Sequence, residues 1–141
     1  MCLKWRRVRN DLRKSDKSSS LYDEAINLID HNDYEGAIKS IIKNIDRLEN
    51  QDDIALAYLN CGFLHDKLGD NISAIDDFSK SIYFEAKIDI MIQRSKDISF
   101  NGRSNSKYKY GDYKGAIEDK RYAKKIRINE IDRFSELNNI K

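Results

Sequence analysis

The sequence predicts an all-α fold, and three observations lead to this prediction. Proline is absent from all 141 residues, which favours long helices because proline interrupts the helical hydrogen-bond ladder. Alternation of apolar and polar residues, the pattern of a half-buried strand, is confined to Ile88–Ile92, which is too short and isolated to build a sheet. A turn motif flanked by segments of helical length occurs three times along the chain.

The repeated motif has the order Gly or Asn, Asp, Tyr or Asn, two variable residues, Ala and Ile. Its copies are Asn32–Ile38, Gly69–Ile75 and Gly111–Ile117. The first position suits the left-handed end of a helix, which Gly enters without steric cost and Asn enters more readily than most residues. The following Asp has a side-chain oxygen that can cap the next helix. The small Ala lets two antiparallel helices approach closely, so the expected unit is helix, tight turn and helix.

Each helix of these pairs also has an expected start and an expected buried side. Ser20–Asp23 has the spacing of a capping box, and Asp52 or Asp53 is placed to cap the third helix. The buried side of that helix is expected to carry Ile54, Tyr58, Cys61 and Leu64. The buried stripe of each second helix is expected to start at the motif's isoleucine, Ile38, Ile75 or Ile117. A charged final helix, over about 113–136, is expected to cover the exposed end of the stack.

The second copy carries a family resemblance. Ala57–Asp70 followed by Ala74–Phe78 resembles the signature of the tetratricopeptide repeat (TPR), whose helix pairs stack into a superhelix. Gly62 stands at the small packing position of the first helix, Ala74 at that of the second, and Phe78 at the large one. The third copy departs from the pattern, because Lys120 stands where a large apolar residue is expected. The aligned motif positions are 37 and 42 residues apart, against about 34 in a regular repeat.

The resemblance implies an α-α solenoid of about three TPR-like pairs with a C-terminal capping helix within residues 18–141. Residues 1–17 are basic and lack helical periodicity, so they are expected to form a flexible arm. It also implies a protein-interaction module, an adaptor or assembly factor, that binds a peptide or amphipathic helix in a concave groove. The groove positions carried over from the family are Tyr22, Ile26, Ile29, Leu59, Phe63, Asp66, Lys67, Asn101, Asn105 and Tyr108. The groove that clamps chaperone tails is not matched, since only Asn60 agrees with it. The alternative is that the apolar groove residues are covered by the arm or by a second copy of the chain.

Charge is distributed unevenly along the chain. Residues 1–17 hold seven basic and two acidic side chains (net +5), residues 18–90 hold six and fifteen (net −9), and residues 91–141 hold thirteen and seven (net +6). The acidic pairs at 76–77 and 118–119 are interpreted as solvated helix faces. A basic patch is expected from Arg6, Arg7, Arg9, Lys120, Arg121, Lys124, Lys125 and Arg127. This patch supports an alternative function, the binding of nucleic acid or another anionic surface, and it also allows head-to-tail self-association.

No catalytic, cofactor or metal site is expected, and the chain is not expected to be an enzyme. His31 falls at a helix end and His65 at a core position of the repeat. Cys61 is expected to be a small core residue, and with Cys2 it forms neither a disulfide framework nor a zinc-binding spacing. Neither a Gly-rich phosphate loop nor a paired acid/base site is apparent.

The sequence also gives expectations about location. No stretch approaches the roughly 20 apolar residues that span a bilayer, and Met1–Arg9 lacks the apolar run of a secretory signal. We therefore expect a cytoplasmic protein without a transmembrane segment. The richness in Ile, Asn and Lys indicates an AT-rich bacterial genome.

Overall fold

The protein is all-α over the residues that the computed structural model describes, 19–85 and 96–139. Six helices account for most of them, with no strand among these residues: α2 (Ser19–Asp30), α3 (Tyr34–Ile45), α4 (Gln51–Leu68), α5 (Asn71–Glu85), α6 (Lys96–Tyr110) and α7 (Tyr113–Asn139). This confirms the predicted fold class. The expected basic arm over 1–17 lies outside the described residues, as does the segment 86–95 between α5 and α6.

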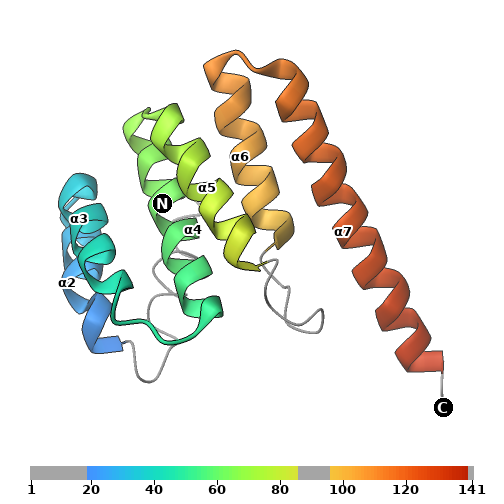
Figure 1. The fold of residues 1–141 in the computed structure, drawn as a ribbon, viewed down its shortest axis with the longest axis horizontal. Helices are drawn as coiled ribbons and strands as arrows, with labels where there is room; N and C mark the ends of the chain where they lie inside the picture. The colour runs from blue at the N-terminus through green and yellow to red at the C-terminus, as the bar shows by residue number, and fades with distance from the viewer. Residues whose placement is uncertain (1–18, 86–95, 140–141) are drawn as a thin grey trace.

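The helices pack in chain order. Each of them contacts the next one along the chain, and α4 also contacts α6. Figure 1 shows the resulting row, with α2 and α3 at one end and α7 at the other. The interior helix α5 therefore lies between α4 and α6 in the order of packing, whereas α7 comes last and packs against α6.

The three predicted turns are present. Asn32, Gly69 and Gly111 adopt positive φ angles of 61°, 79° and 101°, and each follows or closes the end of a helix. Asn32 is the only non-glycine residue with a positive φ among the described residues. The motif's first position is thus the left-handed helix end, where a Cβ atom is costly for most side chains.

The aspartate after each of these turns caps the next helix, as the motif predicts. The backbone N–H three residues further on donates to the carboxylate of Asp33, Asp70 and Asp112, over 2.9, 3.1 and 2.9 Å. The cap of α4 was predicted incorrectly. Asn50 is the cap residue there, and it accepts from the Asp53 N–H over 2.7 Å while its amide donates to the Asp53 carboxylate.

Removing one of these caps has a predictable cost. We expect Asp112→Ala to lower the free energy of unfolding by about 1 kcal/mol, because the first amides of α7 lose their acceptor. Asp112→Asn keeps a side-chain oxygen at the same place and should retain most of the stability. Urea unfolding followed by circular dichroism measures both, and equal stability of Asp112→Ala and wild type would contradict this role of the cap.

The core is built from two clusters of side chains. The larger lies between α2, α3 and α4 and contains Tyr22, Ala25, Ile26, Ile29, Ala37, Ile38, Ile41, Ala57, Cys61 and Leu64. The smaller joins α4 and α5 through Leu59, Ala74 and Phe78, with Ile98 of α6 packed against it. The motif alanines Ala37, Ala74 and Ala116 are all buried, as predicted.

Phe78 is the central large residue of the second cluster, in agreement with the prediction. Its side chain is fully buried. A Cβ atom built on Gly62 of α4 would stand 2.8 Å from the Phe78 ring, and one built on Gly102 of α6 would stand 2.5 Å from it. The ring therefore fills the space that two glycines leave between α4, α5 and α6.

The predicted buried stripe weakens towards the end of the chain. Ile38 is buried and Ile75 is half-buried, but Ile117 has 55% of its surface exposed. The inward face of α7 instead carries Ala116, Asp119 and Ala123. Ile117 and Lys120 both project away from this face, which explains why the large apolar residue expected at position 120 is not needed.

Candidate interaction surface

Four of the ten predicted groove residues are core residues in this structure. Tyr22, Ile26, Ile29 and Leu59 have 8% or less of their surface exposed, and they belong to the two clusters described above. Burial, followed by the nearby charge of Asp53, raises the pKa of the Tyr22 phenol well above its usual value. These four side chains therefore pack between helices. The prediction that they line an open groove is wrong.

The other predicted groove residues lie on α4 and α6, and contacts within the chain occupy several of them. Phe63 is half-buried and meets the Phe78 ring edge-on, with 5.2 Å between the ring centres. Asp66 accepts hydrogen bonds from Lys109 over 2.7 Å and from Ser106 over 3.3 Å. The amide of Asn101 donates to the backbone of its own helix. The residues of the predicted set that are exposed are Lys67, Asn105 and Tyr108.

The exposed apolar side chains gather on the last two helices. Eleven large hydrophobic residues are exposed in the described part of the chain, and seven of them lie at the end of α6 or on α7. These seven are Tyr108, Tyr110, Tyr113, Ile117, Tyr122, Ile128 and Ile131, with exposed fractions from 46% to 64%. Only Tyr108 was among the predicted site residues. The sequence shows the other six as apolar residues of a helix, and apolar periodicity does not tell whether another helix covers them.

One side of α7 carries most of this apolar surface. Tyr113, Ile117, Ile128 and Ile131 lie on one helix face together with Lys120 and Lys124, since these six residues follow one another at three- or four-residue steps. We call this face the outer stripe; it consists of Tyr113, Ile117, Lys120, Lys124, Ile128 and Ile131, all of them exposed. The buried face of the same helix, with Ala116, Asp119 and Ala123, packs towards α6.

Aromatic rings crowd the turn at the start of α7. The rings of Tyr108 and Tyr113 meet edge-to-face with their centres 5.1 Å apart, and Tyr110 is exposed beside them in the sequence, just before the turn at Gly111. On the other flank of α7, Tyr122 stacks on Phe100 at 5.6 Å. Tyrosines of this kind offer large rigid contact areas with a hydroxyl at the tip, the side-chain type most enriched where proteins bind each other.

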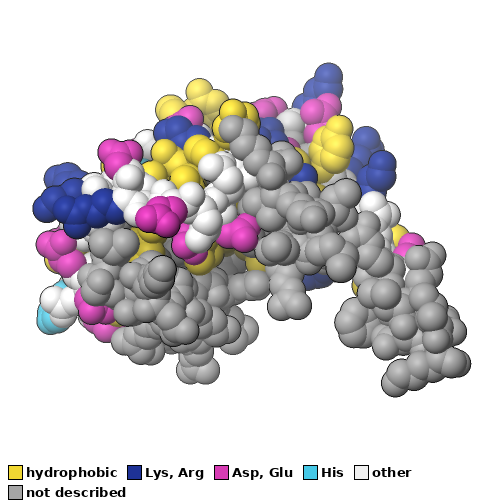
Figure 2. Space-filling model, turned by 60° about the horizontal axis from the view of Figure 1, so that its bottom comes forward, with side chains coloured by type: hydrophobic (Ala, Val, Ile, Leu, Met, Phe, Trp, Pro, Cys, Tyr) yellow, Lys and Arg dark blue, Asp and Glu magenta, His cyan; other side chains and the backbone are white. Residues whose placement is uncertain are grey.

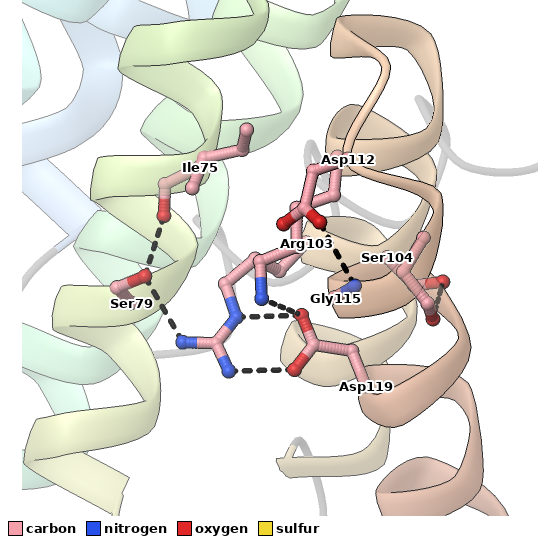
Figure 3. A network of polar contacts seen from close by, with 9 residues as sticks. Ile75, Ser79, Arg103, Ser104, Asp112, Gly115 and Asp119 are labelled. Carbon is pink, nitrogen blue, oxygen red and sulfur yellow. Dashed lines mark hydrogen bonds and ion pairs between the residues drawn. The ribbon is translucent and has the colours of Figure 1, made fainter.

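A buried ion pair fixes α7 to the helix row (Figure 3). Two guanidinium nitrogens of Arg103 on α6 donate to the two carboxylate oxygens of Asp119, over 2.8 and 2.7 Å. Lys107 adds a third contact to this carboxylate at 2.9 Å. A further Arg103 nitrogen donates to Ser79 of α5 over 3.0 Å, so one side chain links three helices. The outer stripe is thereby held in a fixed orientation.

The prediction that residues 118–119 form a solvated pair is wrong, because Asp119 is buried and only Glu118 is exposed. Burial acts to raise the pKa of Asp119, but the hydrogen bonds and charges of Arg103 and Lys107 outweigh it and hold the pKa below its usual value. The carboxylate is therefore ionised at neutral pH and fully used within the fold.

The prediction that residues 76–77 form a solvated pair is also wrong, because Asp77 is buried. Its carboxylate is buried and lies 2.7 Å from the Nδ1 atom of His65, while Asp76 is exposed and pairs with Lys80 one turn later. Burial raises the pKa of Asp77. His65 thus connects α4 to α5 and lines a shallow pocket of about 340 Å³ with residues of α3 and α4.

Five basic residues predicted for the patch lie on the surface of α7. Lys120, Arg121, Lys124, Lys125 and Arg127 are exposed, and Arg127 lies 3.8 Å from Asp97 of α6. Figure 2 shows basic and hydrophobic side chains next to each other on the part of the surface that α6 and α7 form. The remaining members of the predicted patch, Arg6, Arg7 and Arg9, lie outside the described residues.

The one cysteine in the described part of the chain, Cys61, is buried. Burial raises the pKa of the Cys61 thiol far above its usual value, which leaves it un-ionised and a poor nucleophile. Among residues 19–85 and 96–139, no three His, Cys, Asp or Glu side chains are arranged to hold a metal ion. No helix in these two segments has both the length and the apolar character needed to cross a membrane.

Comparison of the chain with protein-family models, with curated proteins and with solved structures finds no match. The likeness to the tetratricopeptide repeat therefore rests on the residues themselves, above all on Gly62, Ala74 and Phe78.

Proposed function

We propose that the chain is a protein-interaction module of the TPR-like superhelical kind, and that its partner docks on the outer stripe of α7. The observation that carries this proposal is the concentration of exposed large apolar side chains on α6 and α7, seven of the eleven in the described chain. Apolar surface gathered in one place on a soluble helical protein is more often an interaction site than solvated surface. No catalytic or cofactor-dependent role is proposed, and a cytoplasmic location stays part of the proposal.

The position of α7 supports a helical partner. Within the row, each helix packs on the next one along the chain. The outer stripe has two apolar pairs, Tyr113 with Ile117 and Ile128 with Ile131, at the four- and three-residue spacing with which one helix packs on another, and Lys120 and Lys124 lie between them on the same face. A partner helix that lies along α7 would extend the row by one member. Lys120 and Lys124 would then face it, so acidic residues beside its apolar positions would favour binding.

This surface replaces the concave groove as the preferred site. The groove prediction depended on Tyr22, Ile26 and Leu59 as apolar anchors, and these are buried within the core. Of the predicted groove residues, Lys67, Asn105 and Tyr108 are exposed, so Tyr108 is the one exposed apolar anchor of that set, and its ring packs against Tyr113 at the start of α7.

A second candidate function is the binding of nucleic acid or another anionic surface. It is favoured by five exposed basic residues within eight positions of α7, from Lys120 to Arg127. Phosphate contacts of this kind weaken steeply with added salt, whereas apolar docking does not. The two candidates therefore differ in their salt dependence.

Affinity capture from a lysate of the native source tests the proposal. Ile117→Glu/Ile131→Glu places charges in the outer stripe, and Ile42→Glu/Tyr83→Glu is the matched control, with exposed hydrophobics changed on α3 and α5. We expect wild type and control to retain a protein that the stripe variant loses. Circular dichroism verifies that both variants keep their helicity.

Two results would refute docking on α7. The first is retention of the same protein by the stripe variant. The second is release of the captured material from wild type by nuclease or by about 0.5 M salt, where the Debye length is roughly 4 Å; that release would support the anionic-surface candidate instead.

A further inference from the structure

The two halves of the helix row carry opposite charge. Residues 19–85, which form α2 to α5, hold five basic and fourteen acidic side chains, a net charge of −9. Residues 96–139, which form α6 and α7, hold eleven basic and seven acidic ones, a net charge of +4. The outer stripe belongs to the basic half, so a surface of complementary charge exists on the same molecule.

The acidic half offers a hollow that suits the residues of the stripe. The pocket of about 340 Å³ lies between α3 and the end of α4, and its lining includes Ile38, Leu68, Glu35 and Asp70. Ile38 is buried, while Leu68 has 42% of its surface exposed. Two hydrogen bonds from Ser73 hold the pKa of Asp70 below its usual value, so this carboxylate is ionised at neutral pH.

An exposed apolar residue follows the pocket residue Asp70 closely in the sequence. Ile72, two residues after Asp70 at the start of α5, has 64% of its surface exposed. We call the pocket together with Ile72 the receiving patch. It combines two accessible apolar side chains, Leu68 and Ile72, with carboxylates at Glu35 and Asp70; Lys39 is the one lysine in the pocket lining.

The outer stripe has the inverse composition. Its apolar residues flank Lys120 and Lys124, whose stems can lie along apolar surface while their ammonium groups reach carboxylates. The receiving patch is on α3, α4 and α5, whereas the stripe is on α7, at the far end of the row (Figure 1). The patch and the stripe are therefore separate surfaces, and one copy of the chain can contact a second copy through each of them.

We propose that the outer stripe of one copy docks on the receiving patch of a second copy, head to tail. This inference rests on the proposed function, because it names the occupant of the same surface. Such a contact joins two different surfaces and leaves one of each free at the ends, so it produces growing chains unless the geometry closes a ring. Charge complementarity between the two halves also opposes the alternative stripe-to-stripe contact, in which Lys120 and Lys124 would face like charges.

Complementation between two variants tests this arrangement. Ile117→Glu/Lys120→Glu disables the stripe, and Glu35→Lys/Leu68→Lys disables the receiving patch; none of these four side chains is fully buried or caps a helix. Ile42→Lys/Asp46→Lys is the control for the patch variant, with the same change of charge on α3 and at the residue that follows it. Sedimentation velocity gives the mass of the full chain at concentrations up to about 1 mM.

We expect the mass of wild type and control to rise with concentration above the 16.5 kDa of one chain, and each disabled variant to stay at that mass. An equimolar mixture of the two disabled variants has one intact stripe and one intact patch, so it should form pairs of twice that mass and nothing larger. A monomeric wild type, or a mixture that does not pair, overturns head-to-tail association. If self-association is absent but Ile117→Glu/Ile131→Glu loses the protein captured from lysate, the proposed function stands, with a different protein as partner.

Discussion

Phe78→Ala is expected to lower the free energy of unfolding by about 4 kcal/mol, in the middle of the range for loss of a buried aromatic side chain. The ring is fully buried and fills the space between Gly62 and Gly102, where even a methyl group would collide with it. Its loss leaves a cavity bounded by the backbones of two helices, which cannot move inward without shifting α4 against α6. Chemical unfolding followed by circular dichroism measures the change.

The glycines supply the matched test of this packing. Gly102→Ala should destabilise the protein by about 1–2 kcal/mol, because overpacking outweighs the better helix propensity of alanine. Combined with Phe78→Leu, the added methyl group gains room, so the double variant should lose less than the sum of the two single changes. A Phe78→Ala protein that unfolds within 1 kcal/mol or so of wild type would show that the site collapses around the missing ring.

Asp119→Ala is expected to cost about 3 kcal/mol, because it leaves two partly buried cations, Arg103 and Lys107, without their shared carboxylate. The same side chain of Arg103 links α5, α6 and α7, so the variant should also loosen α7. Asp76→Ala is the control: this carboxylate is exposed and pairs with Lys80 on its own helix, which contributes a few tenths of a kcal/mol at most. Equal stabilities of the two variants would contradict this account.

The stabilisation by Asp119 also has a defined pH dependence. Its pKa is lower in the folded protein than the value of about 3.9 in an unfolded chain. The contribution is therefore fully present above the unfolded pKa and is lost as the pH falls through the folded pKa. We expect the stability difference between wild type and Asp119→Asn to shrink as the pH is lowered below about 4. A difference that stays constant into strong acid would assign the effect to packing alone.

Local chemistry made the turns predictable from the sequence. A left-handed residue followed by a capping aspartate uses only atoms within a few residues of each other, so Gly69 and Asp70 could be placed without knowledge of the fold. The packing of Gly62, Ala74 and Phe78 was expected from the resemblance to the tetratricopeptide repeat, and all three residues are buried.

The candidate site depended on contacts between distant segments, and these were not predictable. Asp119 looked solvated because its partner Arg103 lies on another helix, sixteen residues away. Apolar periodicity identified the side of a helix that avoids water, but not what covers that side. Tyr22 was predicted to line an open groove but is buried between α2, α3 and α4, whereas Ile117 was predicted to be buried but is exposed on the last helix of the row.

Photo-crosslinking tests the central claim, that the outer stripe is the interaction surface, most directly. A photoreactive amino acid is placed at Ile117 in the stripe, at Asn105 on the side of the predicted groove, or at Tyr83 on α5, all of which are exposed. Irradiation in native-source lysate, followed by mass spectrometry of the products, reports which position touches a partner. The account predicts a discrete protein adduct, either a second copy or another chain, from position 117 and none from 105 or 83. An adduct from position 105 without one from position 117 would contradict it and restore the concave groove.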